Sequence, residues 1–157
     1  MRKQYNLYNL EPLFKKYLLT ENISLISLKN YLSDIRHFFG WLISYLESNN
    51  IESTSSDRNS VEFITVKTIS EYKSYLITNI IPHKTINRRL STIRKFCAFC
   101  ISQGWLKENP AKQILNIKNQ GSNLNILDQF KSDLEKEKLD QLVITSYLDD
   151  IRDFLKV

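Results

Sequence analysis

Residues 24–46 read SLISLKNYLSDIRHFFGWLISYL and contain the pattern that decides the fold. The large apolar side chains of this stretch recur three and four positions apart, which places them on one side of an α-helix: Leu28, Tyr31, Leu32, Ile35, Phe38, Phe39, Leu42, Tyr45 and Leu46. Ser24 stands directly before them and is a residue type that favours the N-cap position of a helix. The stretch therefore predicts a long amphipathic helix that begins after Ser24 and packs one face into a core.

The same helical spacing recurs along nearly the whole chain, and no strand pattern competes with it. Thr65 or Thr68 is expected to cap a helix that follows, and Gly104 to end a later helix in the left-handed conformation. The further helices are expected at about residues 10–18, 66–78, 84–103, 126–138 and 142–156, with a short one starting at Asn109–Pro110. The sequence thus predicts an all-α protein.

The composition is that of a globular protein, because 42% of the 157 residues are hydrophobic and 25% are charged. Three Gly and three Pro argue against collagen-like and turn-dense β proteins. The longest stretch without a charged residue, 96–106, has 11 residues and is too short to cross a bilayer. We therefore expect a cytoplasmic protein without a signal peptide and without a membrane partner.

Charge is distributed unevenly along the chain. Residues 1–121 carry 17 Lys and Arg against 9 Asp and Glu, whereas residues 122–157 carry 5 against 8. We predict a compact helical domain at residues 1–118, followed by a linker and an acidic helical segment at 119–157. A basic domain suggests a polyanionic partner such as nucleic acid.

The acidic segment resembles the first two predicted helices. When it is moved back by 116 positions, 10 of 25 positions are identical: Phe130, Lys131, Leu134, Glu137, Tyr147, Leu148, Asp150, Ile151, Arg152 and Phe154 fall on Phe14, Lys15, Leu18, Glu21, Tyr31, Leu32, Asp34, Ile35, Arg36 and Phe38. Amphipathic helices can match in this way through composition alone; the other interpretation is a partial second copy. A partial copy cannot bury its own apolar face, so we expect it to dock on the first domain, pair with another chain or be completed by further sequence.

Residues 84–95, KTINRRLSTIRK, carry five basic side chains and no acidic one. With Ile86, Leu90 and Ile93 in the core, the helical period places a polar set on the outer face: Lys84, Arg88, Ser91, Thr92 and Lys95, with Asn87 and Arg94 at its edge. An α-helix fits the major groove of DNA, where Arg can bind guanine and Asn can bind adenine. An ordinary solvated basic face explains the same residues, and on these residues alone it is the favoured interpretation.

The long helix at 24–46 offers a second polar face, made of Ser27, Lys29, Asn30, Ser33 and His37. Short hydroxyls and amides of this kind can bond phosphate or base edges. We expect Asp34 and Arg36, in contrast, to pair with neighbours inside the protein.

The two helices together resemble the core-binding domain of tyrosine recombinases, the phage integrase family. The pattern of the family's second helix, a Thr/Ser-rich start followed by Tyr-x-x-Asp-Leu-Arg-x-Phe-x-x-Trp-Leu, is matched by Ser27, Tyr31, Asp34, Ile35, Arg36, Phe38, Trp41 and Leu42. A later family helix is matched by Thr85, Ile86, Arg88, Leu90, Ser91, Ile93, Arg94 and Phe96, and a closing Asn-Pro by Asn109–Pro110. The resemblance covers about residues 10–117. It implies a SAM-like bundle of four or five helices whose second and fourth helices lie against duplex DNA.

By position, the resemblance implies DNA contacts from both helices: Ser27, Lys29, Asn30, Ser33, Lys84, Thr85, Asn87, Arg88, Ser91, Thr92 and Lys95. The catalytic domain of the family brings an Arg, a His-x-x-Arg box and a Tyr nucleophile, and this sequence contains no His-x-x-Arg. We predict sequence-dependent DNA binding in site-specific recombination without strand cleavage by this chain, and no cofactor, metal or small-molecule substrate. The alternative is a protein-interaction or regulatory domain that associates, with a copy of itself or another chain, through residues 122–157.

Two further features have structural explanations. Cys97 and Cys100 lie in the middle of a predicted helix, whereas a redox Cys-x-x-Cys usually opens a helix beside a strand. A tetrahedral zinc site needs two more ligands, which no nearby His or Cys supplies. We expect both cysteines, as well as Trp41 and Trp105, to pack in the core.

Overall fold

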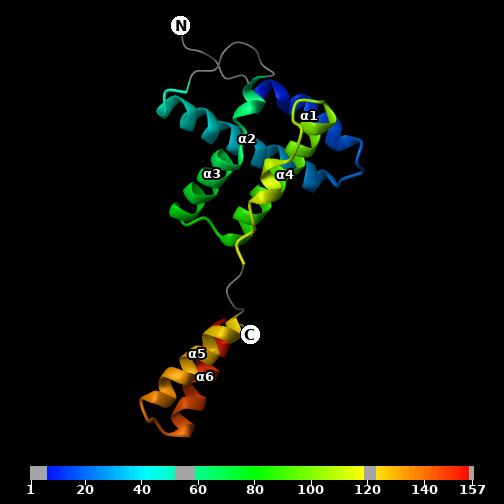
Figure 1. Cartoon of the computed structure of the whole chain (residues 1–157). Coiled ribbons are helices and arrows are strands. Elements are labelled where there is room, and N and C mark those ends of the chain that lie inside the picture. The colour runs from blue at the N-terminus through cyan, green and yellow to red at the C-terminus, as the bar shows by residue number, and fades with distance from the viewer. Residues whose placement is uncertain (1–6, 52–58, 119–122, 156–157) are drawn as a thin grey trace. The chain divides into compact units, whose positions relative to one another are not determined.

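The computed structural model describes residues 7–51, 59–118 and 123–155 (Figure 1). These residues contain helices and no strand, which confirms the all-α prediction. In chain order the elements are η1 (Leu7–Leu10), α1 (Glu11–Leu19), α2 (Leu25–Ser48), η2 (Asn59–Phe63), α3 (Val66–Thr78), α4 (His83–Ser102), η3 (Pro110–Gln113), α5 (Asn123–Lys136) and α6 (Gln141–Leu155), where η denotes a 3₁₀ helix. The chain divides into two compact units, Met1–Ile117 and Lys118–Val157. The predicted division into a compact domain at residues 1–118 and a linker with an acidic helical segment at 119–157 stays a prediction.

Three of the helix caps expected from the sequence are present in the first unit. Ser24 caps α2, because its hydroxyl accepts a hydrogen bond of 3.1 Å from the Ser27 amide. Thr65 rather than Thr68 caps α3; the Thr65 hydroxyl accepts from the Thr68 amide, and the Thr68 hydroxyl accepts from the Thr65 amide in return. Gly104 follows α4 with φ +74°, a left-handed conformation that glycine adopts without strain.

Helix α2 packs against α1, α3 and α4, with α1 and α3 on either side of it (Figure 1). Aromatic rings join these elements in edge-to-face pairs. The ring of Phe96 on α4 lies 5.2 Å from the ring of Phe14 on α1 and 5.2 Å from that of Phe39 on α2. Phe38 on α2 meets Tyr72 on α3 at 5.0 Å. The apolar stripe of α2 therefore holds the other three helices in place.

Both cysteines lie in the core, as predicted, and neither forms a disulfide. Burial raises the pKa of the Cys97 thiol to about 12 and raises the pKa of the Cys100 thiol as well, so both remain protonated near neutral pH. Trp41 and Trp105 also pack against the core. The helical spacing of residues 84–103 also places Ile101, beside Cys100, on the buried stripe of α4, but Ile101 is exposed.

The second unit is a pair of helices, α5 and α6, which pack against each other through buried side chains that include Leu127 and Ile144. Helix α6 also carries exposed apolar side chains, among them Tyr147 and Phe154. Among the described residues of both units, no helix has the length and apolar character needed to cross a membrane.

Candidate nucleic-acid interface

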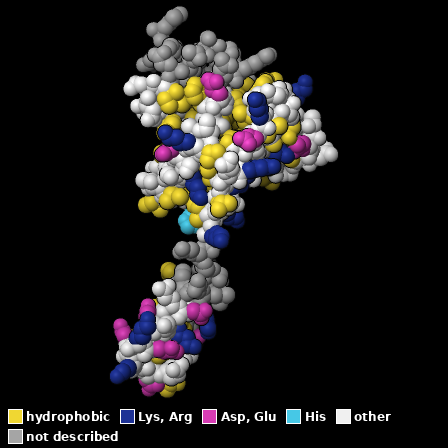
Figure 2. Space-filling model, viewed as in Figure 1, with side chains coloured by type: hydrophobic (Ala, Val, Ile, Leu, Met, Phe, Trp, Pro, Cys, Tyr) yellow, Lys and Arg dark blue, Asp and Glu magenta, His cyan; other side chains and the backbone are white. Residues whose placement is uncertain are grey.

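The predicted DNA-contacting residues lie on α2 and α4, which pack side by side. The exposed members of the set are Lys29, Ser33, Lys84, Arg88 and Ser91, and the partly buried members are Ser27, Asn30, Thr85, Asn87 and Lys95. Figure 2 shows Lys and Arg side chains at several separate points on the visible face of the first unit, with Asp and Glu side chains between them. The basic character of this unit is therefore interrupted by carboxylates, and the partners of each basic residue decide what it can bind.

A buried carboxylate, Asp34 on α2, organises the centre of this surface. Its Oδ1 accepts a hydrogen bond of 2.8 Å from Arg88 Nη2 and lies 3.8 Å from Arg89 Nε. Its Oδ2 accepts a bond of 3.2 Å from the Thr92 hydroxyl. A buried charge must find donors or counter-charges within the protein, and here all three partners come from α4. Asp34 thus pairs internally, as predicted, and ties α2 to α4.

The prediction that Thr92 contacts DNA is wrong. Thr92 is buried, and its hydroxyl donates to Asp34 and lies within bonding distance of the Arg88 carbonyl oxygen. The helical period places Thr92 beside Arg88 and Lys95, but on the side of α4 that faces α2. The sequence held a signal for this contact, since Asp34 falls inside an apolar stripe and needs donors from a neighbouring helix.

The Asn87 amide is hydrogen-bonded within the fold, and its predicted contact with DNA stays a prediction. Its amide nitrogen donates to the Ile117 carbonyl at 2.9 Å, and its amide oxygen accepts from the Ile117 N–H at 2.8 Å. Arg94 acts in the same way, because its guanidinium donates to the carbonyls of Ala111 and Ile114. Both side chains fasten residues 111–117, which include part of η3, onto α4, so these hydrogen bonds are used within the fold.

Arg88 combines a fixed position with exposure. Its side chain is 48% exposed, while Nη2 is held by Asp34. A guanidinium has five N–H donors in a planar fork, and Asp34 takes only part of that capacity. The structure therefore presents Arg88 at the surface with its orientation restricted, which is favourable for reading a base or gripping a phosphate.

Lys95 is partly neutralised by an acid that sequence analysis did not connect with it. Its ammonium forms an ion pair with the Glu21 carboxylate, in the turn between α1 and α2, and lies 5.8 Å from the centre of the Tyr17 ring. Hydrogen bonding to Glu21 raises the pKa of Lys95, and the same bond lowers the pKa of Glu21. A phosphate that binds Lys95 must compete with this carboxylate.

A basic hollow lies where α1 meets α2. It has a volume of about 250 Å³ and is lined by Lys15, Leu25, Leu28, Lys29, Leu32 and Arg36. Arg36 donates to both carboxylate oxygens of Glu11 on α1, with Nε at 2.9 Å from each. The expectation that Arg36 pairs within the protein is thus confirmed. Lys15 was not predicted here, because its distance from α2 depends on how the two helices pack.

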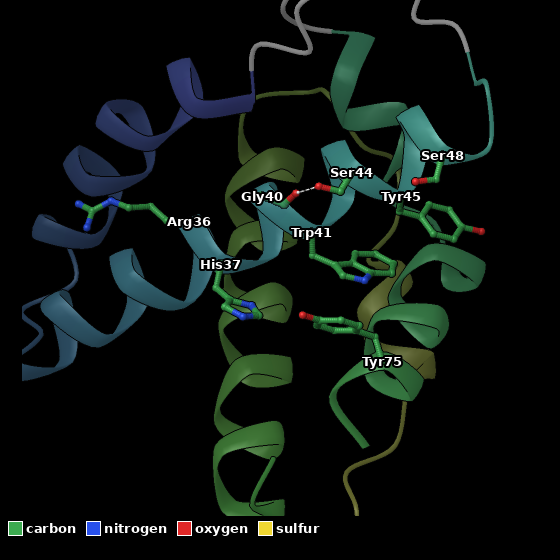
Figure 3. Close-up of a pocket in the computed structure, with 8 residues that line it drawn as sticks. All are labelled: Arg36, His37, Gly40, Trp41, Ser44, Tyr45, Ser48 and Tyr75. Atoms are coloured by element: carbon green, nitrogen blue, oxygen red, sulfur yellow. Dashed lines mark hydrogen bonds between the residues drawn. The ribbon is translucent and has the colours of Figure 1, made fainter. Parts of the chain in front are cut away.

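A second hollow, of about 580 Å³, follows α2 toward α3 and is shown in Figure 3. The rings of Trp41, Tyr45 and Tyr75 line it together with His37, whereas the Arg36 side chain points away from these rings. Its lining is mainly aromatic rather than basic, which separates it chemically from the hollow beside Lys29. Among the described residues, no group of three or more His, Cys, Asp or Glu side chains is placed to hold a metal ion.

His37 connects this second hollow with the Asp34 cluster. Its Nδ1 lies 2.7 Å from the Tyr72 hydroxyl, and its Nε2 lies 3.3 Å from Arg89 Nη1. Because a guanidinium can only donate, Nε2 accepts and the proton of the neutral ring resides on Nδ1. Burial lowers the pKa of His37, and the neighbouring Arg89 charge lowers it further.

Comparison with known proteins adds the family. Residues 12–104 match the family model described as phage integrase, N-terminal SAM-like domain. The chain belongs to this family. The matched range covers most of the segment from α1 to α4, so every residue of the candidate interface lies within the SAM-like domain, whereas α5 and α6 lie outside it.

Two curated relatives are tyrosine recombinases. The SAM-like chain is 34% identical over 108 residues to tyrosine recombinase XerD of Rickettsia prowazekii (strain Madrid E), which is 69% of this chain and 29% of that protein. It is 36% identical over 63 residues to tyrosine recombinase XerC of Chlamydia muridarum (strain MoPn / Nigg), which is 40% of this chain and 20% of the relative. The chain thus spans less than a third of either relative. No solved structure matches it.

The Asp34 cluster leads to a prediction about stability. Replacing Asp34 with Asn removes the charge that compensates Arg88 and Arg89, and we expect the free energy of unfolding to fall by about 2–4 kcal/mol. Urea denaturation of the full chain measures this loss. Glu47→Gln makes the same chemical change at an exposed position of α2 and should alter stability by less than about 0.5 kcal/mol. Equal effects of the two substitutions would contradict the role assigned to Asp34.

The lowered pKa of His37 leads to a prediction about pH. The unfolded chain takes up a proton at His37 more readily than the folded chain, so stability falls as the pH drops through the ordinary histidine range near 6.5 toward the lower folded pKa. We expect the difference in urea midpoint between pH 7.5 and pH 5.5 to be smaller in His37→Gln than in the native chain. His83→Gln removes a histidine that is exposed at the start of α4 and serves as control. An unchanged pH difference in His37→Gln would refute the prediction.

Proposed function

We propose that this chain binds duplex DNA through α2 and α4 and serves as the DNA-binding module of a site-specific recombination system. The observation that carries the proposal is the family match over residues 12–104. It is supported by Lys29, Lys84 and Arg88, which are exposed on two helices that pack against each other. Action on DNA in the cytoplasm is part of this proposal.

The side chains divide into those suited to phosphates and those suited to bases. Lys29 and Lys84 are exposed point charges and would neutralise phosphates without regard to sequence. Arg88, held by Asp34, has the planar donors that bind guanine edges. Hydroxyls and one amide complete the proposed surface: Ser27, Asn30, Ser33, Thr85 and Ser91. Lys95 contributes once a phosphate replaces Glu21 as its partner.

We further propose that this chain does not cleave DNA by itself. A tyrosine attacks a phosphodiester only within a preorganised cationic site that stabilises the developing charge. The relatives are named tyrosine recombinases and are more than three times as long as the matched regions. The matched regions of this chain contain no His-x-x-Arg sequence.

Protein interaction through the second unit is a second candidate function. It is favoured by the exposed apolar side chains of α6, including Tyr147 and Phe154. This function is compatible with DNA binding because it uses a different unit. Self-association through residues 122–157, as predicted from the sequence, would be one form of it.

DNA binding can be tested with full-length protein and a pool of random duplexes, from which bound sequences are selected and read. We expect log K to fall linearly with log salt concentration, with a slope of about −0.9 per neutralised phosphate. Arg88→Ala should relax base preference at one position by about 1–3 kcal/mol. Lys84→Ala should weaken all sequences alike and reduce the slope by about one phosphate.

Lys107→Ala is the matched control for these variants, since Lys107 is exposed beyond the end of α4 and should leave affinity unchanged. Thermal melting of each variant separates loss of binding from loss of fold. Binding that is insensitive to salt, or that survives Arg88→Glu unchanged, would overturn the proposal.

The absence of cleavage can be tested on a supercoiled plasmid that carries a selected binding site. We expect no relaxed plasmid and no covalent DNA–protein adduct after incubation with the chain, because a tyrosine alone lacks the cationic site. Arg88→Glu provides the control for contaminating nuclease, since it should not bind the site. A phosphotyrosyl adduct with the native chain, absent with Arg88→Glu, would show that the chain is an enzyme.

A further inference from the structure

The second unit corresponds to the first two helices of the SAM-like domain in the position of its second helix as well as in sequence. Helix α2 begins at Leu25 and α6 at Gln141, a separation of 116 positions. In the turn before each helix, Asn22 and Lys138 adopt left-handed conformations with φ of 53° and 57°, again 116 positions apart. A residue of positive φ follows each helix from α1 to α5, so the correspondence rests on the shared spacing of 116 positions and not on this conformation alone.

The start of the second helix also corresponds in detail. The Leu28 amide donates to the Ser24 carbonyl at 2.9 Å, and the Ile144 amide donates to the Asp140 carbonyl at 3.0 Å. Leu28 and Ile144 occupy equivalent positions, and both are buried. The inner face of α6 is therefore packed on α5 as that of α2 is packed on α1.

The two units differ on the face that turns away from their first helix. Phe38 is fully buried, whereas Phe154 at the equivalent position is 84% exposed. Asp34 is buried, whereas its equivalent Asp150 is exposed. In the first unit α3 covers Phe38 through Tyr72, and α4 covers Asp34. The described part of the second unit has no element that corresponds to α3 or α4.

In the first unit two helices cover this face, α3 at Phe38 and α4 at Asp34, and α4 shows the chemistry that meets the carboxylate. Helix α4 presents apolar side chains and, toward Asp34, the guanidinium of Arg88 and the hydroxyl of Thr92. Helix α6 carries the same pattern of one carboxylate and apolar side chains, and all of these groups are exposed. They are Asp150, Phe154 and Tyr147, and the Tyr147 side chain is 49% exposed. We propose that this face of α6 docks an amphipathic helix of another protein that places an arginine against Asp150 and apolar side chains against Phe154 and Tyr147.

Charge argues against DNA and against a second copy of α6 as occupants of this face. Asp149 and Asp153 stand at the positions of Ser33 and His37, and their carboxylates would repel DNA phosphates. Pairing with a second copy would bring Asp150 and its neighbours against the same acidic residues across a twofold axis. DNA and a second copy would both place negative charge opposite the carboxylates of α6. A basic helix would place positive charge there instead. The proposed face lies on the second unit, so the inference is independent of the proposed DNA binding.

The test uses the full chain and a fluorescent peptide with the sequence of residues 83–102, a helix that has the proposed chemistry. We expect saturable binding by fluorescence anisotropy under reducing conditions. Phe154→Ala and Asp150→Arg should each weaken binding by at least about tenfold, because they remove an apolar contact and reverse the charge that meets Arg88. Both residues are exposed, so neither substitution disturbs the fold. Asp149→Arg makes the same charge change beside this face and should have less than about a threefold effect.

A charge swap tests whether Arg88 of the peptide meets Asp150 of the chain. A peptide carrying Arg88→Glu should bind the native chain at least about tenfold more weakly, and Asp150→Arg in the chain should restore its binding. Absence of saturable peptide binding, or equal losses for Asp149→Arg and Asp150→Arg, would overturn the proposal. So would a stable dimer in light scattering that Phe154→Ala dissociates, since the face would then belong to a second copy, or DNA binding that is lost with Phe154→Ala.

Discussion

One buried carboxylate constrains how α4 packs against α2. Asp34 lies in the apolar stripe of α2, where its charge must be compensated from α4. Compensation fixes the rotation of α4, because Arg88 and Thr92, one turn apart, must both reach the same side chain. The same contact turns Thr92 inward and leaves Arg88 half exposed at the surface. The need to compensate the Asp34 carboxylate therefore decides which side chains of α4 lie in the core and which lie at the candidate interface.

Most of the fold could be predicted from the sequence, because the helices depend on local interactions. Caps such as Ser24 and Thr65 act within one turn, and the left-handed stop at Gly104 depends on a single residue. The apolar stripe of α2 required only the helical period. The error at Ile101 has a similar origin: the helical period assigned it to the buried side of α4, but the period alone does not say which part of a stripe other elements cover, and Ile101 is exposed.

The candidate site was less predictable, because it depends on pairs that are far apart in the sequence. Asp34 and Thr92 are 58 positions apart, and Lys95 and Glu21 are 74 apart. The helical period places a side chain on a side of its own helix, but it does not say which neighbour that side meets. Asn87 shows the limit most clearly, since its partner is the backbone of Ile117 and no pattern of side chains identifies a backbone partner.

Because Lys95 is already paired with Glu21, an anion can bind Lys95 only by replacing that carboxylate. The displaced Glu21 carboxylate must then be hydrated by solvent. Weakly charged or isolated acids gain little from that exchange. A polymer that brings several phosphates at once gains from every neighbouring lysine and arginine, so the resident glutamate discriminates in favour of ligands of high charge density.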